Sequence, residues 1–246
     1  MRLTSLRFRG GAVADPIDGK LHEALRVLER SPLAKLQDPS FIADTIRIAG
    51  LVFDARRPYG TDNAWMNRDH RGLWQIPLQL GRCLAEISRY NVRSAIEIGT
   101  WSGWTTAFLA TFLACVNGRV SVTSVDRAFS HATRMPRVVR LYTGTSADFA
   151  DNSYDLAVID GNHSYDWCCA DYDAVGRRAA ICMFHDINDK FVRRVHSLDG
   201  GAPRFWREMK LNAEPGDQLL EFLDHSERDQ IMGIGLRVRP SARQRT

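Results

Sequence analysis

Acidic and histidine side chains stand at the ends of several short apolar runs in this sequence. Glu97, Asp126 and Asp160 each end or directly follow such a run, and His163 and His185 lie near two of these ends. Carboxylates accept hydrogen bonds from ligand hydroxyls or bind cations, whereas imidazoles transfer protons near neutral pH. Open α/β sheets bind their ligands at the carboxyl ends of the strands. The placement of these residues therefore predicts one ligand-binding and catalytic site.

The apolar runs themselves predict the sheet that would position this site. From residue 93 onward they alternate with helix-like segments, the pattern of a parallel sheet covered on both faces. We expect strands at residues 94–98, 120–125, 138–142, 156–159, 181–184, 219–223 and 234–238. We expect helices at residues 104–116, 165–175 and 203–211. The predicted fold class is α/β, with a doubly wound sheet of about seven strands.

The first ninety residues predict a helical N-terminal cap. Apolar residues recur at helical spacing within residues 21–28 and 76–87, and Asp38 before Pro39 is a helix N-cap signal. Residues 54–73 show no clear period and predict a long loop, which could act as a lid and bring His70 to a substrate. The predicted organisation is a cap with a lid loop at 1–90, a ligand-binding domain at 91–239 and a basic tail at 240–246.

A tight turn follows the first predicted strand, in the sequence IEIGTWSGW of residues 96–104. Gly99 lets the backbone approach a ligand, and the helix that begins after Gly103 offers unpaired N–H groups to an anion. A dinucleotide-binding turn would have the spacing Gly-x-Gly-x-x-Gly, which is absent here. The turn therefore argues against a nicotinamide-dependent oxidoreductase, although a purely structural turn also fits these residues.

Asp126 ends the next predicted strand, 29 residues after Glu97. A carboxylate has two acceptor oxygens, so Asp126 could hold both hydroxyls of a ribose. The alternative is that Asp126 only caps the turn that follows it. Because two acids at consecutive strand ends flank a glycine-rich turn, a cofactor site is the stronger interpretation.

Three later stretches occur together with this turn. They are YDLAVIDGNHSY at residues 154–165, the pair His185-Asp186, and Arg-Phe-Trp at residues 204–206. With the turn at residues 97–103, they resemble class I S-adenosylmethionine-dependent methyltransferases, in the branch that includes antibiotic-tailoring O-methyltransferases and cephalosporin hydroxylase-like proteins. The resemblance covers residues 75–239 and implies a Rossmann-like fold and transfer of a methyl group from S-adenosylmethionine.

The resemblance also implies which residues bind the cofactor. They are Glu97, Gly99, Thr100, Gly103, Asp126, Ser146, Ala147 and Asp160. The loop at residues 144–149 would contact the adenine, through Asp148 or through the neighbourhood of Ser146. An Asx turn or a helix cap explains the residues of this loop equally well.

Asp160 and Asp186 are the predicted acceptor-side carboxylates, at the ends of adjacent strands. Two carboxylates suit a hard cation, so Mg²⁺ or Ca²⁺ could bind there and lower the pKa of a substrate hydroxyl. Alternatively, the two acids cap helices or bind an arginine. His163 or His185 could instead take the hydroxyl proton as the methyl group is transferred. The catalytic candidates are therefore His163, His185 and Asp160.

Composition limits the remaining function classes. The formal net charge of +4 is too small to demand a nucleic-acid partner, and no apolar run is long enough to cross a membrane. Five cysteines without a CxxC pair predict reduced thiols in the cytoplasm. We expect a small-molecule acceptor and possible self-association.

The alternatives left open are an RNA methyltransferase and a non-catalytic cofactor-binding protein. A basic segment at each end of the chain could touch RNA or an anionic surface, but solvated, frayed termini are the stronger interpretation. These arginines are Arg2, Arg7, Arg9, Arg237, Arg239, Arg243 and Arg245.

Overall fold

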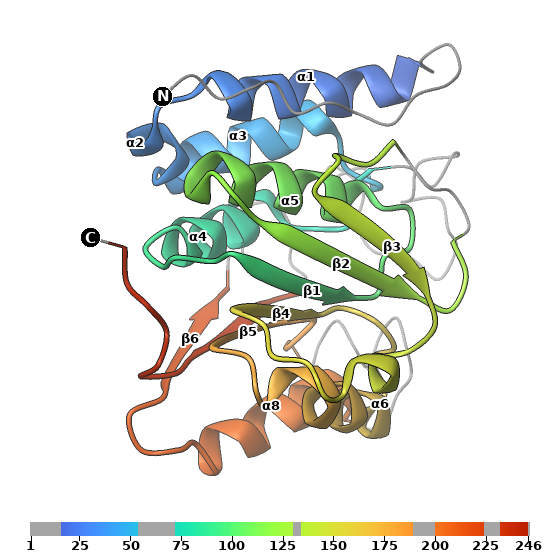
Figure 1. Ribbon diagram of the computed structural model, residues 1–246, viewed down its shortest axis with the longest axis vertical. Coiled ribbons are helices and arrows are strands. Elements are labelled where there is room, and N and C mark those ends of the chain that lie inside the picture. Colours follow the sequence, from blue (N-terminus) through green and yellow to red (C-terminus); the bar gives the residue numbers. More distant parts are fainter. Residues whose placement is uncertain (1–15, 54–71, 130–133, 189–199, 224–231, 246) are drawn as a thin grey trace.

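Seven strands form one mixed sheet in the computed structural model, which describes residues 16–53, 72–129, 134–188, 200–223 and 232–245 (Figure 1). The order is β3-β2-β1-β4-β5-β7-β6. The bounds are β1 Ser94–Ile98, β2 Ser121–Asp126, β3 Val139–Thr143, β4 Leu156–Ile159, β5 Ile181–His185, β6 Gln218–Phe222 and β7 Ile234–Val238. Strands β1 to β5 are parallel, whereas β7 is antiparallel to both of its neighbours. The predicted α/β, Rossmann-like doubly wound sheet is confirmed.

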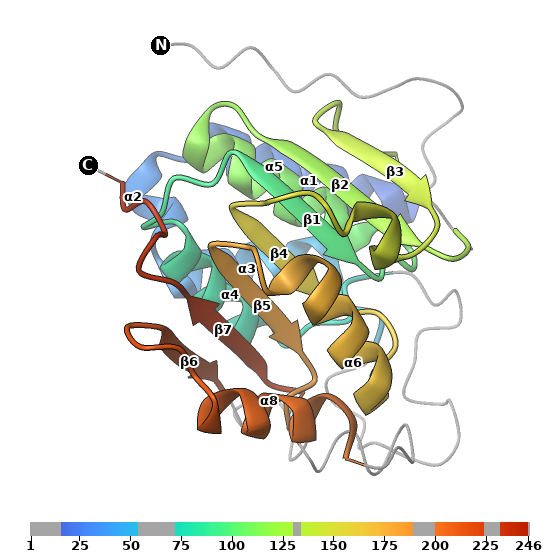
Figure 2. The same cartoon turned by 60° about the horizontal axis from the view of Figure 1, so that its bottom comes forward.

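Helices cover both faces of this sheet (Figures 1 and 2). One face carries α4 (Pro77–Ile87) and α5 (Trp104–Asn117), and the other carries α6 (Tyr165–Asp171) and α8 (Gly201–Leu211). The N-terminal helices α1 (Pro16–Arg30), α2 (Leu33–Leu36) and α3 (Pro39–Ala49) form an outer layer. Helix α1 packs against α3 and α5, and α3 packs against α4. The helical cap therefore continues the hydrophobic core rather than forming a separate one.

Local sequence explains where these elements lie. All residues of β4 and β5 are buried, as expected for strands covered on both faces. The Asp38 carboxylate accepts hydrogen bonds from the backbone N–H groups of Ser40 (2.9 Å) and Phe41 (3.4 Å), which confirms the predicted N-cap of α3. Helix α4 belongs to the predicted N-terminal cap, yet it contacts β6 and β7 directly.

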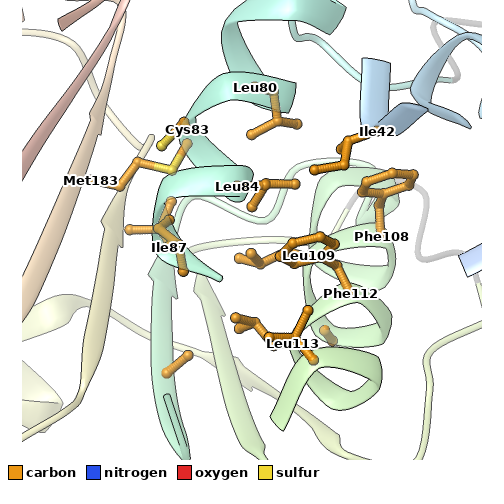
Figure 3. Close-up of a cluster of buried hydrophobic side chains, with 14 of the residues drawn as sticks. Ile42, Leu80, Cys83, Leu84, Ile87, Phe108, Leu109, Phe112, Leu113 and Met183 are labelled. Atoms are coloured by element: carbon orange, nitrogen blue, oxygen red, sulfur yellow. The ribbon is translucent and has the colours of Figure 1, made fainter. Parts of the chain in front are cut away.

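Apolar side chains of α4 and α5 meet in the core between the two helices (Figure 3). The α4 residues include Leu80, Leu84 and Ile87, and they face Phe108 and Phe112 of α5. All five side chains are buried. Because α5 is apolar around nearly its whole circumference, it can pack against the sheet on one side and the N-terminal helices on the other.

One segment and one side chain differ from the sequence predictions. The helix expected over residues 165–175 is α6 followed by a π-helical turn, Tyr172–Gly176. Arg237, expected in a basic terminal segment, is instead buried in β7. Its guanidinium donates hydrogen bonds to Tyr172 Oη (2.7 Å) and to the carbonyl oxygens of Gly176 (2.8 Å) and Ala179 (2.9 Å). All five residues of β7 are buried, so the position of Arg237 in this strand, rather than its charge, determines where its side chain lies.

The C-terminal segment is also docked rather than frayed. Asn91 N–H donates to the Arg243 carbonyl (2.8 Å), and Arg245 N–H donates to the Arg89 carbonyl (2.7 Å). Among the described residues, no helix has both the length and the apolar character needed to cross a membrane. All five cysteines are free thiols, as predicted. The predicted lid loop at residues 54–73 lies outside the described residues except for its last two residues. His70 and the three N-terminal arginines lie wholly outside them.

Candidate functional site

A cavity of about 370 Å³ lies at the carboxyl ends of the five parallel strands. The arrows of the parallel strands β1 to β5 in Figure 2 point toward this end of the sheet. Each parallel strand contributes lining residues where it ends, including Gly99, Asp126, Gly144, Asp160 and Asp186. The cavity therefore lies where the chain pattern predicted it, at the switch point between β1 and β4.

The turn after β1 is built around a close backbone contact. Gly99 has φ +97°, and a Cβ atom there would lie 2.1 Å from the carbonyl oxygen of Asp160. Gly103, with φ +77°, caps the start of α5. Trp101 also adopts a left-handed conformation, φ +45°, which costs free energy in any residue with a side chain. A side chain at position 99 would therefore clash with the backbone at the end of β4, at a position that also lines the cavity.

Asp126 holds this turn in place. Its Oδ2 accepts hydrogen bonds from the backbone N–H groups of Thr100 (2.9 Å) and Trp101 (2.8 Å), and its Oδ1 accepts one from Ala128 (3.2 Å). Asp126, Gly99 and Thr100 all line the cavity. The carboxylate therefore stabilises both flanking turns and still borders the space where a ribose is predicted.

Glu97 departs from its predicted role. Only 1% of the residue is exposed, and it is not among the described residues that line the cavity. Its Oε2 accepts hydrogen bonds from Ser124 Oγ (2.5 Å) and from the hydroxyl of Thr106. Burial raises the pKa of Glu97 to about 7, and these hydroxyls partly offset the rise. The structure thus places Glu97 beneath the turn, where it joins β1, β2 and α5.

The loop after β3 divides its predicted residues between two roles. Ser146 lines the cavity, and its hydroxyl donates to Asp171 Oδ1 (2.6 Å). Asp148 instead caps the short 3-10 helix Ser146–Phe149, because its Oδ2 accepts from the Thr145 N–H (2.9 Å). Ala147 and Gly103 are not among the described residues that line the cavity. The helix-cap alternative is therefore the one observed for Asp148.

Several cavity residues were missed by the sequence predictions, and all of them except Arg127 lie away from strand ends. Asp171 is buried, and this burial raises its pKa. The Arg127 guanidinium lies 5.8 Å from the centre of the Trp167 ring, and both residues line the cavity. Trp74 and Trp101, which also line the cavity, form an aromatic pair with ring centroids 5.0 Å apart. No local signal indicates these partners, since each pair joins separate segments.

The four acceptor-side candidates form one cluster. His185 Nδ1 lies 3.0 Å from Asp160 Oδ1 and 3.3 Å from Asp186 Oδ1. His163 Nε2 lies 3.4 Å from Asp186 Oδ2. The side chain of His163 is 17% exposed, whereas that of His185 is 2% exposed. His163 is thus the more accessible imidazole.

Electrostatics separates the two histidines further. Burial by itself lowers the pKa of His185, but the carboxylates of Asp160 and Asp186 outweigh it and hold this pKa well above its ordinary value. A raised pKa and two carboxylate neighbours both make His185 a poor general base. Its Nε2 is buried without a hydrogen-bond partner in the described part of the chain, so the ring is held through Nδ1.

The predicted cation site does not fit this arrangement of side chains. Among the described residues, no three His, Cys, Asp or Glu side chains are placed so that they could hold a metal ion. The Nδ1 atom of His185 lies against an oxygen of each candidate ligand, Asp160 and Asp186. The Gln75 amide donates to the other Asp160 oxygen (3.2 Å). Binding of Mg²⁺ or Ca²⁺ here stays a prediction that the geometry does not favour.

Residues 96–187 match a family model described as a methyltransferase domain. The O-methyltransferase TomG from Streptomyces achromogenes, solved with S-adenosylmethionine, is 17% identical, with a TM-score of 0.49 over 68% of this chain and 81% of that chain. A putative O-methyltransferase from Klebsiella pneumoniae is 15% identical, with a TM-score of 0.48 over 92% and 91%.

A third similar structure is the methyltransferase MycE of the mycinamycin biosynthetic pathway, solved with Mg, S-adenosylhomocysteine and mycinamycin VI. It is 12% identical, with a TM-score of 0.49 over 72% of this chain and 52% of that chain. No curated protein matches the chain. The family model confirms the resemblance to class I methyltransferases over residues 96–187, and the seven-stranded sheet order agrees with it.

Proposed function

We propose that this protein transfers the methyl group of S-adenosylmethionine to a hydroxyl oxygen of a small molecule. The observation that carries the proposal is the meeting of two groups of residues in one cavity. The glycine turn with Asp126 lines one part, and the cluster of Asp160, His163 and Asp186 lines another. A donor and an acceptor could thus be aligned for an in-line displacement.

The cofactor side suits an adenosyl ligand. Asp126 borders the cavity, and its carboxylate oxygens can accept hydrogen bonds from ligand hydroxyl groups. Helix α5 begins beside it. Ser146 and Asp171 supply further polar groups at the end of β3. When bound, S-adenosylmethionine supplies an electrophilic methyl group. Within this proposal, Gly99, Thr100, Asp126, Ser146 and Asp160 remain the cofactor-contacting candidates, and Glu97 supports them from below.

On the acceptor side, we assign the general base to His163. Its imidazole takes the hydroxyl proton as the oxygen–methyl bond forms and the sulfur–methyl bond breaks, with the electron pair remaining on sulfur. Asp186 orients the ring through the 3.4 Å contact with Nε2. His185 holds Asp160 and Asp186 together through Nδ1. Asp160 thereby positions the cluster rather than acting on the proton.

Labelled S-adenosylmethionine and a panel of hydroxylated small molecules test the reaction itself. We expect methyl transfer to at least one acceptor, and His163→Gln should lower kcat by ~10²–10⁴-fold, the range for general-base catalysis. Affinity for S-adenosylhomocysteine, measured by calorimetry, should change little in this variant. A thermal shift caused by NAD but not by S-adenosylhomocysteine would instead support an oxidoreductase. Transfer only to RNA would support the RNA methyltransferase alternative.

Other predictions from the sequence stay proposals. We assign the reaction to residues 91–239, with residues 1–90 as the cap and lid and residues 240–246 as the terminal segment. A cytoplasmic location rests on the five free thiols. Self-association can be tested by sedimentation. Binding without turnover would reduce the protein to a cofactor-binding module, and a single-turnover assay separates the two.

A further inference from the structure

We propose that the N–H group of His185 Nδ1 takes the place that a divalent cation would need between Asp160 and Asp186, so that the cluster assembles without a metal. The inference rests on the proposed function, because it concerns the acceptor-side cluster assigned above. It makes His185 a positioning residue that joins the two carboxylates.

The position of Nδ1 requires a proton on that atom. Two carboxylate oxygens lie close to it, at 3.0 Å on Asp160 and 3.3 Å on Asp186. A carboxylate oxygen only accepts hydrogen bonds, and an imidazole nitrogen without a proton also only accepts. Three acceptors at these distances would repel one another. A proton on Nδ1 turns the same contacts into attractions, as a cation would.

The outer oxygens of the two acids also face nitrogen atoms. Gln75 Nε2 donates to Asp160 Oδ2 (3.2 Å), and His163 Nε2 lies 3.4 Å from Asp186 Oδ2. Each of the four carboxylate oxygens therefore has a nitrogen beside it. A cation bound between the two Oδ1 atoms would have to displace the His185 ring.

The fold opposes such a displacement. The His185 side chain is 2% exposed, and His185 pairs with Ile234 in the β5–β7 ladder. The next residue, Asp186, has φ +58°, so the chain leaves the strand in a left-handed conformation. His185 also lines the cavity, so a ring displaced by a cation would have to move into that space and lose its contacts with both carboxylates. The strand end thus holds the imidazole between the two acids.

Binding of Mn²⁺, followed by electron paramagnetic resonance, tests this inference on the full chain. We expect wild type to bind Mn²⁺ more weakly than ~1 mM, the weak end of oxygen-ligand sites. We expect His185→Glu to bind Mn²⁺ and to gain thermal stability with it, because a third carboxylate replaces the imidazole. His185→Gln is the matched control, since it removes the imidazole without adding a charged ligand, and it should bind no Mn²⁺.

A long-range ¹H–¹⁵N correlation spectrum of wild type provides a test that needs no variant. The His185 signals should show a proton on Nδ1 and should not move when Mg²⁺ is added. Three results would overturn the inference: Mn²⁺ binding by wild type that Asp160→Asn abolishes, a folded His185→Glu that binds no Mn²⁺, or a His185 proton on Nε2 alone. None of these measurements uses methyl transfer, so the inference and the proposed function can fail separately.

Discussion

Burial decides what the Glu97 carboxyl can do. The group lies under the turn with Ser124 and Thr106 as its partners, and burial raises its pKa from 4.5 to about 7. Between these two values the folded protein holds a proton that the unfolded chain releases. Stability is therefore fully present at low pH and declines as the pH rises toward 7.

We expect Glu97→Gln to remove this pH dependence. A neutral amide keeps a hydrogen-bonding group in the same place but has no proton to lose. Relative to wild type, the free energy of unfolding of the variant should be larger at pH 8 than at pH 5, by up to about 3 kcal/mol. Urea unfolding at both pH values checks this. Parallel pH profiles for the two proteins would contradict a raised Glu97 pKa.

Asp126 combines support of the turn with the predicted ribose contact. Asp126→Ala should weaken binding of S-adenosylhomocysteine by about 1–3 kcal/mol and also lower stability, because two backbone N–H groups lose their acceptor. Asp148→Ala is the matched control, since Asp148 caps a 3-10 helix beside the cavity. The control should lose stability and keep its affinity. Equal affinities in calorimetry for wild type and Asp126→Ala would remove Asp126 from the cofactor site.

In the turn between β1 and α5, the absence of a side chain at Gly99 allows close backbone contact with the end of β4. Any Cβ atom at position 99 would overlap the Asp160 carbonyl oxygen and the backbone of Gly161. The cofactor-side turn and the acceptor-side turn are therefore in direct backbone contact. A change at Gly99 should be felt on both sides of the cavity.

Gly99→Ala should destabilise the protein by roughly 3–5 kcal/mol, because steric overlap adds to an unfavourable φ. Gly118→Ala is the matched control. Gly118 also has a positive φ, +77°, but no atom lies within 4 Å of its added Cβ. The control should cost only about 1–2 kcal/mol, the usual cost of a left-handed conformation. If chemical denaturation gives equal losses for the two variants, the close contact with Asp160 has no energetic importance.

The layers of the molecule are tied together at the amino ends of the strands by the C-terminal segment. It bonds to Arg89 and Asn91 beyond α4, and the Arg245 guanidinium donates to Asn117 Oδ1 at the end of α5 (2.8 Å). The same Asn117 oxygen accepts from the Val92 N–H (3.2 Å). The segment thus links α4, α5 and the start of β1.

Deleting residues 241–246 should lower the free energy of unfolding by roughly 2–4 kcal/mol, through loss of these hydrogen bonds. Arg243→Ala should change it little, because Arg243 contributes a backbone carbonyl and its residue is exposed. Urea unfolding of the two variants provides the comparison. A truncated protein as stable as wild type would mean that the segment is a solvated tail after all.

Local patterns determined much of this molecule before any contact was known. The runs of apolar residues predicted all seven strands to within one residue at each end. They could do so because a strand inside a sheet is recognised by its own apolar residues, without knowledge of its partners. Asp38 before Pro39 and the glycines at 99 and 103 marked turns and caps, which need particular side chains or none. The strand-end acids and histidines were found because parallel strands bring their carboxyl ends together.

Partners distant in sequence were decided only by the tertiary structure. Glu97 is buried against the hydroxyl groups of Thr106 and Ser124. Arg237 is buried against the carbonyl oxygens of Gly176, in the π-helical turn, and of Ala179. The pairing of β4 with β5 places the His185 ring between the carboxylates of Asp160 and Asp186. Residue type limits the chemistry of each group, but the neighbours that set its charge are brought close by chain packing, and no spacing along the sequence encodes them.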